Sequence, residues 1–534
     1  MVELDMPALR LDTLDADLAA SLAALADDLA RPDGRVAQSR ALVEAALADG
    51  RAHYGLNTGF GALKSERIGP DDVAQLQVNL LRSHACGVGD PTPPALTRRM
   101  LALKAHALGR GFSGVSPAVV TGLLALLDAD LVPVVPQQGS LGASGDLAPL
   151  AHLTLPLIGE GSVWDDGRPA PAADALRQAG LEPVALGAKD GLALINGTQF
   201  MLAYAVEVAQ RARRLATTAD VVAAMTLEAR LGSARPFDAR VAALRPHPGH
   251  AQSAEAVRRL LDGSEIGPSH AACGRVQDPY SVRCVPQVHG ASRDALAFAA
   301  GVVERELNSV TDNPLVFAAQ SPAEVASQSP SEVAAPPPAE GGAGGAADVV
   351  SAGNFHGQPL AIALDTAAIA VAEWASISER RTYLLVDGGD GLPPFLVERS
   401  GLQSGFMIPQ YAAAALVSEN KTLCHPASVD SIPSSRGQED HVSMGAWGAR
   451  KALRVVENAE RVLAVEALCA AQALAFRRPL RAGRGVEAAH AVLRERVAQR
   501  TDDVAFEADF EAATDLVRSG ALVAAAETQT GPLP

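Results

Sequence analysis

The stretch MLAYAVEVAQRARRLATTADVVAAMTLEAR, from Met201 to Arg230, contains neither glycine nor proline. Its apolar and small residues recur along the whole segment, which predicts one long helix. At a rise of about 1.5 Å per residue, helices of about 20 to 35 residues span roughly 30 to 50 Å. Such a rod needs partners of similar length to bury its apolar face, so this stretch favours a bundle of long helices.

Two other segments have the same character. Residues from about 290 to 308 predict a long helix that ends near Asn313-Pro314, because a residue before proline disfavours helix. Residues 440–477 predict a third, in which Gly445 and Gly448 are tolerated weak positions. Signals for a parallel sheet are weak. We therefore expect an all-α fold with an elongated central bundle of long helices.

The N-terminal part has a different sequence pattern. Residues 1–200 alternate short helical patterns with turns rich in glycine and proline, and several candidate site motifs fall in those turns. We expect a smaller globular part over residues 1–200, and a long-helix bundle with a C-terminal helical part over residues 201–534.

Residues 318–348 stand apart from both parts. They contain the near-repeats QSPAEVA and QSPSEVA, followed by APPPAEGGAGGAAD, with no lysine, arginine or aromatic residue. Such a segment buries too little apolar surface to offset its ordering entropy. We interpret it as a disordered surface insertion produced by local duplication, with a recruitment motif as the alternative.

Composition excludes several classes of partner. The 534-residue chain has a formal net charge of −16 and a pI of about 5.2. This charge repels phosphate backbones and anionic lipids, so we expect neither nucleic acid nor membrane partners. The acidic N-terminus lacks the pattern of a signal peptide, and the apolar run 360–374 is interrupted by Asp365.

The cysteines favour a reducing compartment. They are five in number and form no C-x-x-C pair, so a disulfide framework or a zinc site is not expected: Cys86, Cys273, Cys284, Cys424 and Cys469. No His-Glu-x-x-His spacing points to a metal hydrolase either. We expect a cytoplasmic protein without a metal.

The most informative motif is GSLGASGDLAPLAH, from Gly139 to His152. Its Ala-Ser-Gly triplet alone indicates only a turn before a helix, with Ser144 or Asp146 as N-cap. The surrounding residues, however, resemble the signature of the aromatic amino acid ammonia-lyases at nearly every position.

In that family the triplet cyclises without another enzyme. The resemblance implies that Ala143-Ser144-Gly145 becomes a methylidene-imidazolone (MIO), a strong electrophile built into the chain. The residue types suit this reaction: Gly145 allows the backbone to fold back, Ala143 adds little bulk, and Ser144 supplies the hydroxyl that leaves. An electrophile is needed because an amino group leaves poorly.

Three further motifs extend the resemblance. They are HYGLNTGFG (53–61), KDGLALINGTQ (189–199) and QDPYSVRCVPQ (277–287). Taken singly they indicate a glycine-rich loop, a turn and a structural tyrosine–arginine pair. Together with the triplet they resemble the family over roughly residues 45–450 outside the insertion.

The resemblance implies roles for three residues around the reacting carbon. Arg283 clamps the substrate carboxylate with a bidentate pair, which lysine does not reproduce. Either Tyr54 or Tyr280 abstracts the β-proton. A phenol with an ordinary pKa near 10 needs positive potential nearby to act as a base, for which Arg283 and helix N-termini are the candidates.

Three other residues complete the implied site. Asn196 and Gln277 orient the carboxylate and polarise the MIO group, and Phe355 lines the pocket. Family members build each active site from three subunits of a homotetramer, so we expect that assembly here.

Two features concern the substrate. Ser83-His84 resembles the pair found in the family's histidine-specific members, and Glu439 resembles a carboxylate placed against the imidazole or amino group of the substrate. A carboxylate suits a ring that donates hydrogen bonds and suits phenyl poorly. The resemblance therefore implies deamination of L-histidine to trans-urocanate and ammonia, the first step of histidine degradation.

Rival interpretations remain open. A tyrosine or phenylalanine ammonia-lyase, or a 2,3-aminomutase with the same electrophile, is the nearest. A catalytically dead helical scaffold is the other, although it has no need of Tyr54, Ser144, Tyr280 and Arg283 together. Arg436 and Gly437 depart from the family pattern without a physical explanation.

Overall fold

The computed structural model describes residues 6–49, 51–318 and 347–534. The fold is mainly helical, which confirms the expected class. The chain forms two compact units. The first unit contains residues 1–206, 302–362 and 427–450, and the second contains residues 207–301, 363–426 and 451–534. Four of the five boundaries between the units fall within long helices, and each unit is built from several chain segments.

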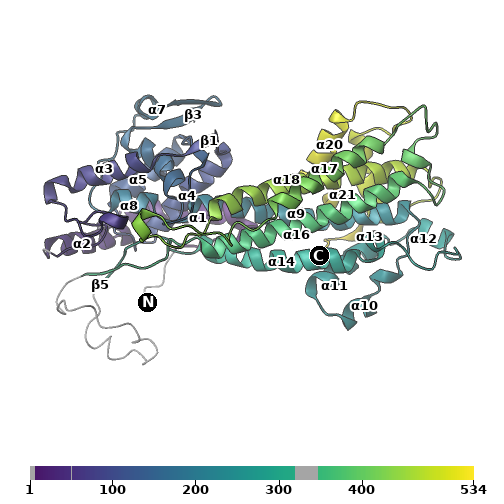
Figure 1. The fold of residues 1–534 in the computed structure, drawn as a ribbon, viewed down its shortest axis with the longest axis horizontal. Helices are drawn as coiled ribbons and strands as arrows, with labels where there is room; N and C mark the ends of the chain where they lie inside the picture. The colour runs from purple at the N-terminus through teal and green to yellow at the C-terminus, as the bar shows by residue number, and fades with distance from the viewer. Residues whose placement is uncertain (1–5, 50, 319–346) are drawn as a thin grey trace. The chain divides into compact units, whose positions relative to one another are not determined.

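The first unit consists mostly of short helices (Figure 1). Those that lie wholly in it are α1 (Leu14–Leu29), α2 (Arg35–Ala48), α3 (Val73–His84), α4 (Pro94–Gly109), α5 (Pro117–Asp128), α6 (Leu147–Thr154), α7 (Ala172–Ala179) and α8 (Asp190–Ile195). Prolines begin α4 and α5, where a missing N–H costs nothing.

Three antiparallel strand pairs also lie in the first unit: β1 (Val88–Pro91) with β2 (Pro136–Gln138), β3 (Ser162–Asp165) with β4 (Arg168–Pro171), and β5 (Leu315–Ala318) with β6 (Ala347–Val350). In the last pair Leu315 faces Val350 and Ala318 faces Ala347. The predicted insertion 318–348 therefore begins and ends inside paired strands, and its remaining residues, 319–346, lie outside the described residues.

Four long helices supply the core of the second unit, and Figure 1 shows them side by side. They are α9 (Gln199–Ala229), α14 (Val285–Leu307), α16 (Gln358–Asp387) and α18 (Gly445–Ala475). Buried polar pairs link them: Arg211 of α9 donates to Glu460 of α18 at 2.9 and 2.6 Å, and His289 of α14 lies 2.7 Å from Asp220 of α9.

Shorter helices complete the second unit. They are α10 (Ala239–Leu244), α11 (Pro248–Leu260), α12 (Ile266–Ser269), α13 (Tyr280–Arg283), α17 (Met407–Leu423), α19 (Arg484–Arg496), α20 (Glu507–Ser519) and α21 (Ala521–Thr530).

Of the predicted long helices, α9 lies within two residues of its expected bounds. Helix α14 starts five residues earlier than expected, because Pro286 is tolerated in its first turn. The expected start of the third helix at Asp440 was wrong. Met444 has a left-handed φ of 52°, so α18 begins only at Gly445.

Helix α16 was not predicted as a helix. It is also the one helix among the described residues that is long and apolar enough to cross a membrane by length and composition. Its most apolar window is 67% buried inside the protein, and Trp374 is fully buried. This burial is what a core helix of the bundle requires.

Candidate functional site

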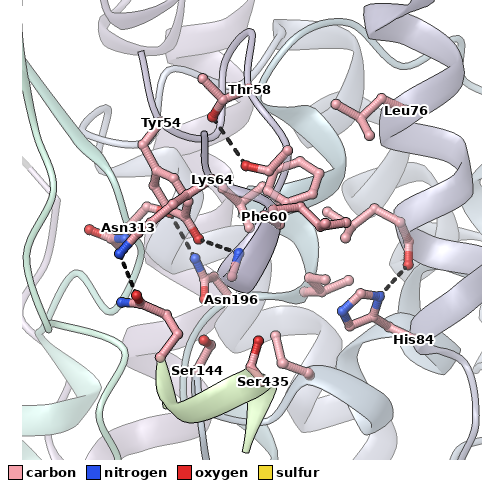
Figure 2. Close-up of a pocket in the computed structure, with 18 of the residues that line it drawn as sticks. Tyr54, Thr58, Phe60, Lys64, Leu76, His84, Ser144, Asn196, Asn313 and Ser435 are labelled. Carbon is pink, nitrogen blue, oxygen red and sulfur yellow. Dashed lines mark hydrogen bonds between the residues drawn. The ribbon is translucent and has the colours of Figure 1, made fainter. Parts of the chain in front are cut away.

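A cavity of about 880 Å³ lies in the first unit (Figure 2). Its walls come from the loop after α2, helix α3, the turn before α6, the end of α8 and three later segments, at Asn313, within 351–355 and within 435–439. Six residues singled out from the sequence line it together: Tyr54, His84, Ser144, Asn196, Phe355 and Glu439. Their convergence from segments far apart in sequence makes this cavity the candidate active site.

The backbone around Ser144 requires glycine at the next position. Gly145 has a left-handed φ of 79° and pairs with Gly197 in an isolated parallel bridge. A Cβ at Gly145 would lie 2.1 Å from the Gly197 carbonyl oxygen, so no other residue fits. The Asp146 amide donates to that same oxygen at 2.8 Å. This backbone, with Ser144 at the cavity wall, fits a cyclising triplet.

Asn196 lies beside this bridge and is 2% exposed. Its side-chain Nδ2 donates to the Asn313 carbonyl oxygen at 2.8 Å, while its Oδ1 is buried without a partner. An unpaired buried acceptor is costly unless a ligand satisfies it. Oδ1 of Asn196 is therefore suited to accept a hydrogen bond from a bound molecule.

Two buried charged residues of this region were not identified as functional from the sequence. Lys104 of α4 donates from Nζ to the Asn196 carbonyl oxygen, and burial lowers the pKa of this lysine to about 7. Burial raises the pKa of Asp146 to about 7. Asp146 is not a side-chain cap, since its Oδ2 accepts from the Met201 amide at 2.9 Å. The sequence did contain a signal for Lys104, because a lysine within the apolar run LALKAHAL indicates a buried charged side chain.

His84 presents a defined tautomer. Its Nδ1 lies 2.8 Å from the Leu80 carbonyl oxygen and 3.0 Å from Ser83 Oγ. Because a carbonyl only accepts, Nδ1 carries the hydrogen and Nε2 remains an acceptor. Burial lowers the pKa of His84, against smaller raising effects of Leu80 and Glu439. The ring is therefore neutral near pH 7.

Glu439 and Tyr54 lie on facing loops at the cavity wall. Glu439 accepts a hydrogen bond from Ser434 Oγ at 2.9 Å through Oε2. The Tyr54 hydroxyl accepts from the Gly61 amide at 3.4 Å. Burial and the charge of Glu439 raise the pKa of Tyr54, so its phenol keeps its proton near neutral pH. Among the described residues, no positively charged group contributes to the pKa of Tyr54.

The other three predicted residues belong to the second unit. Tyr280 and Arg283 share one turn, as expected from their spacing, with the guanidinium 4.9 Å from the ring centroid. Tyr280 is 72% exposed, and Arg283 Nε is buried without a partner. Gln277 and Tyr280 line a separate cavity of about 520 Å³. None of the three lines the cavity that holds Ser144.

In the described part of the chain, no group of three histidine, cysteine, aspartate or glutamate side chains is arranged to hold a metal ion. The cysteines are free thiols, and Cys469 is buried in the second unit.

Known proteins resemble this chain over almost its whole length. A histidine ammonia-lyase of Sorangium cellulosum (strain So ce56) is 54% identical over 504 residues, covering 93% of this chain and 94% of the relative. The crystal structure of histidine ammonia-lyase from Trypanosoma cruzi is 40% identical, with a TM-score of 0.83 over 98% of this chain and 95% of that one.

A tyrosine aminomutase from Streptomyces globisporus is 33% identical, with a TM-score of 0.85 over 99% of both chains. The profile of a family described as aromatic amino acid lyase matches residues 21–495. Since the profile covers most of the sequence and the relatives cover nearly all of it, the chain belongs to the aromatic amino acid lyase family.

Proposed function

We propose that this protein is a histidine ammonia-lyase, which converts L-histidine to trans-urocanate and ammonia. The observation that carries this proposal is the placement of His84 and Glu439 in the same cavity as Ser144. Both polar groups suit a substrate ring with N–H donors. Relatives at about 50% identity that bear this name support the same reaction.

The proposed electrophile forms from Ala143-Ser144-Gly145. The Gly145 nitrogen bonds to the Ala143 carbonyl carbon, whose oxygen leaves as water with the amide hydrogens of Ser144 and Gly145. The Ser144 hydroxyl leaves as a second water with the Ser144 α-hydrogen. The resulting MIO group supplies an electron-poor methylidene carbon. The left-handed φ of 79° at Gly145, which glycine adopts without a Cβ clash, supports this step.

The side chains around the cavity then bind and orient the substrate. His84 Nε2 accepts from the imidazole N–H of the substrate. The Glu439 carboxylate pairs with the amino group, or with the second ring nitrogen when the imidazole is protonated. Asn196 Oδ1 accepts from the amino group. Tyr54 holds its proton in this state, so either its pKa falls when the site is complete or Tyr280 removes the β-proton.

The carboxylate clamp comes from another copy of the chain in this proposal. No arginine lines the cavity among the described residues, whereas Arg283 has an unpartnered Nε and Tyr280 is largely exposed. A homotetramer with shared active sites supplies Gln277, Tyr280 and Arg283 to Ser144 of a neighbouring subunit. We further propose a cytoplasmic location, which suits five cysteines without a disulfide pattern.

The function is tested by following urocanate formation from L-histidine, with L-tyrosine and L-phenylalanine in parallel. Urocanate from the wild-type protein and none from Ser144→Ala is the expected result. Coumarate or cinnamate as the main product would overturn the substrate, and β-histidine would identify an aminomutase. An intact mass lower than the sequence mass by two waters tests the electrophile independently of the substrate.

Subunit sharing has its own test. Ser144→Ala and Arg283→Met chains are each inactive in this proposal, but co-expressed mixtures assemble some sites with both native residues. Restored activity in the mixture, and none when the variants are expressed apart, is expected. An active monomer in light scattering contradicts the proposed assembly.

A further inference from the structure

Lys104 is a buried lysine in an unusual setting. It is 1% exposed within α4, and in the described part of the structure its one hydrogen bond is to the Asn196 carbonyl oxygen. The neighbouring Lys189 instead pairs with Asp312 at 2.6 Å. Burying a lysine without a carboxylate partner is costly even when its pKa falls to about 7, so its presence here needs another explanation.

The hydrogen bond of Lys104 is made to the backbone of the candidate site. Its acceptor belongs to the peptide that joins Asn196 to Gly197, and Gly197 is the residue bridged to Gly145. The Asn196 side chain extends from the same residue to the cavity wall. One hydrogen bond thus restrains the backbone under the cyclising triplet and the base of the Asn196 side chain.

A second set of hydrogen bonds also holds Asn196. Asn196 Nδ2 donates to the Asn313 carbonyl oxygen, and the Asn313 amide donates to Asp312, the partner of Lys189. The field at Lys104 comes from Asp312 and Asp146, which favour the charged form, and from Lys189, which opposes it. Asn196 is therefore held through its side chain by one lysine–aspartate pair and through its carbonyl by Lys104.

We propose that Lys104 is a positioning residue of the active site, whose hydrogen bond to the Asn196 carbonyl oxygen sets the geometry for cyclisation of residues 143–145 and aims Asn196 into the cavity. The inference rests on the proposed function. A positioning role differs from a purely structural one. A purely structural lysine would affect folding but leave the rate of cyclisation in folded chains unchanged.

Lys451 offers a matched control. It is also 1% exposed and donates from Nζ to a backbone carbonyl, that of His425, while pairing with Asp365. It lies in the second unit and does not line the candidate cavity. Lys451→Met therefore reproduces the loss of a buried ammonium without disturbing the Asn196–Gly197 peptide.

The experiment follows maturation in cell-free synthesis, with the intact mass of soluble chains measured at intervals. In Lys104→Met, we expect loss of two waters to be at least about tenfold slower than in wild type, since misplacement of reacting groups by about 1 Å costs roughly 100-fold. Lys451→Met is expected to mature at the wild-type rate, even if its melting temperature falls further.

A second measurement separates positioning from folding. Once matured, Lys104→Met should show a kcat lowered by about tenfold with KM little changed, because Asn196 is misdirected in folded protein. If Lys104→Met is insoluble, Lys104→Gln decides the question, since its amide is polar but too short to reach Asn196. Either variant maturing and turning over like Lys451→Met overturns the inference.

Failure of the proposed function gives a different pattern. If wild-type chains never lose two waters, the electrophile itself is absent and the proposed function fails. If wild type loses them and the Lys104 variants do so equally fast, only the role of Lys104 is rejected.

Discussion

Asp146 in the first unit and Asp220 in the second are both completely buried, yet their pKa values move in opposite directions. Asp220 accepts from Ser253 and His289 through Oδ1 and from Arg293 through Oδ2, at 2.6 to 2.7 Å. These contacts hold its pKa at about 2 despite burial. Asp146 has an unpartnered Oδ1, and burial raises its pKa to about 7.

The difference separates two uses of buried polar groups. At Asp220 in the second unit, opposite charges and hydrogen bonds satisfy the buried carboxylate, and through His289 they join α9 to α14. Around the candidate cavity, Asp146 Oδ1 and Asn196 Oδ1 stay unpartnered. Unsatisfied groups destabilise a fold and are kept where chemistry or binding uses them.

The largest expected effect is at the cavity. Ser144→Ala removes the hydroxyl that the proposed electrophile requires, so kcat for L-histidine should fall by more than about 10³-fold, roughly 4 kcal/mol. The melting temperature should change little, because Ser144 lines a cavity and packs against few groups. Urocanate absorbance and thermal denaturation measure the two effects. Wild-type activity in this variant would show that Ser144 takes no part in the chemistry.

The next effect belongs to the bundle. Arg381 donates to both carboxylate oxygens of Glu466, at 2.6 and 2.8 Å, and both residues are fully buried. Arg381→Met leaves Glu466 charged and mostly unpaired, which should lower the free energy of unfolding by about 3 kcal/mol. Urea denaturation measures it. A stability equal to wild type would mean that the bundle tolerates unpaired charge as the cavity does.

The pH dependence of stability distinguishes the two aspartates. Because the folded pKa of Asp220 lies below its unfolded value near 4, Asp220 stabilises the protein above pH 4, and this contribution fades as pH falls toward 2. Asp220→Asn should cost about 2 kcal/mol at pH 7 and flatten the acid limb of the stability curve. The pKa of Asp146 is raised instead, so its contribution to the stability of the folded state falls as pH rises from about 4 to 7. Denaturation midpoints across pH 3 to 8 test both, and an unchanged acid limb in Asp220→Asn contradicts the assignment.

The smallest expected effect concerns substrate choice. Glu439→Gln removes a charged acceptor at the cavity wall, so KM for L-histidine should rise roughly tenfold, about 1.4 kcal/mol. Glu419→Gln is the matched control, because Glu419 pairs with Arg454 in the second unit and does not line the cavity. Steady-state kinetics with L-histidine decide the point. Equal KM values in the two variants would show that Glu439 does not contribute to substrate binding.

The sequence predicted the parts of this protein that depend on local pattern. The absence of glycine and proline from 201 to 230 was enough for α9. The family resemblance was enough to name six residues of one cavity, three of them within the four quoted motifs. It did not predict α16, whose even apolar composition lacks the periodicity of a half-exposed helix. It also placed the start of α18 too early, because the left-handed turn at Met444 has no signature in residue type.

Long-range contacts account for what the sequence left out of the site. Lys104 meets Asn196 across 92 positions, and Lys189 meets Asp312 across 123, so neither pair has a spacing that a pattern detects. The motif containing Tyr280 and Arg283 indicated their role by resemblance, but neither residue lines the cavity that holds Ser144.

By itself, the sequence determined the helical class and the Ala-Ser-Gly triplet that we propose to cyclise, because helix propensity and the need for glycine at position 145 are properties of short segments. Only the tertiary structure decided which groups are charged. Burial lowers the pKa of Lys104 and raises those of Asp146 and Tyr54, while buried partners keep Asp220 ionised. The charge of a buried group depends on the solvent it loses and the partners it gains, and both are set by residues distant in the chain.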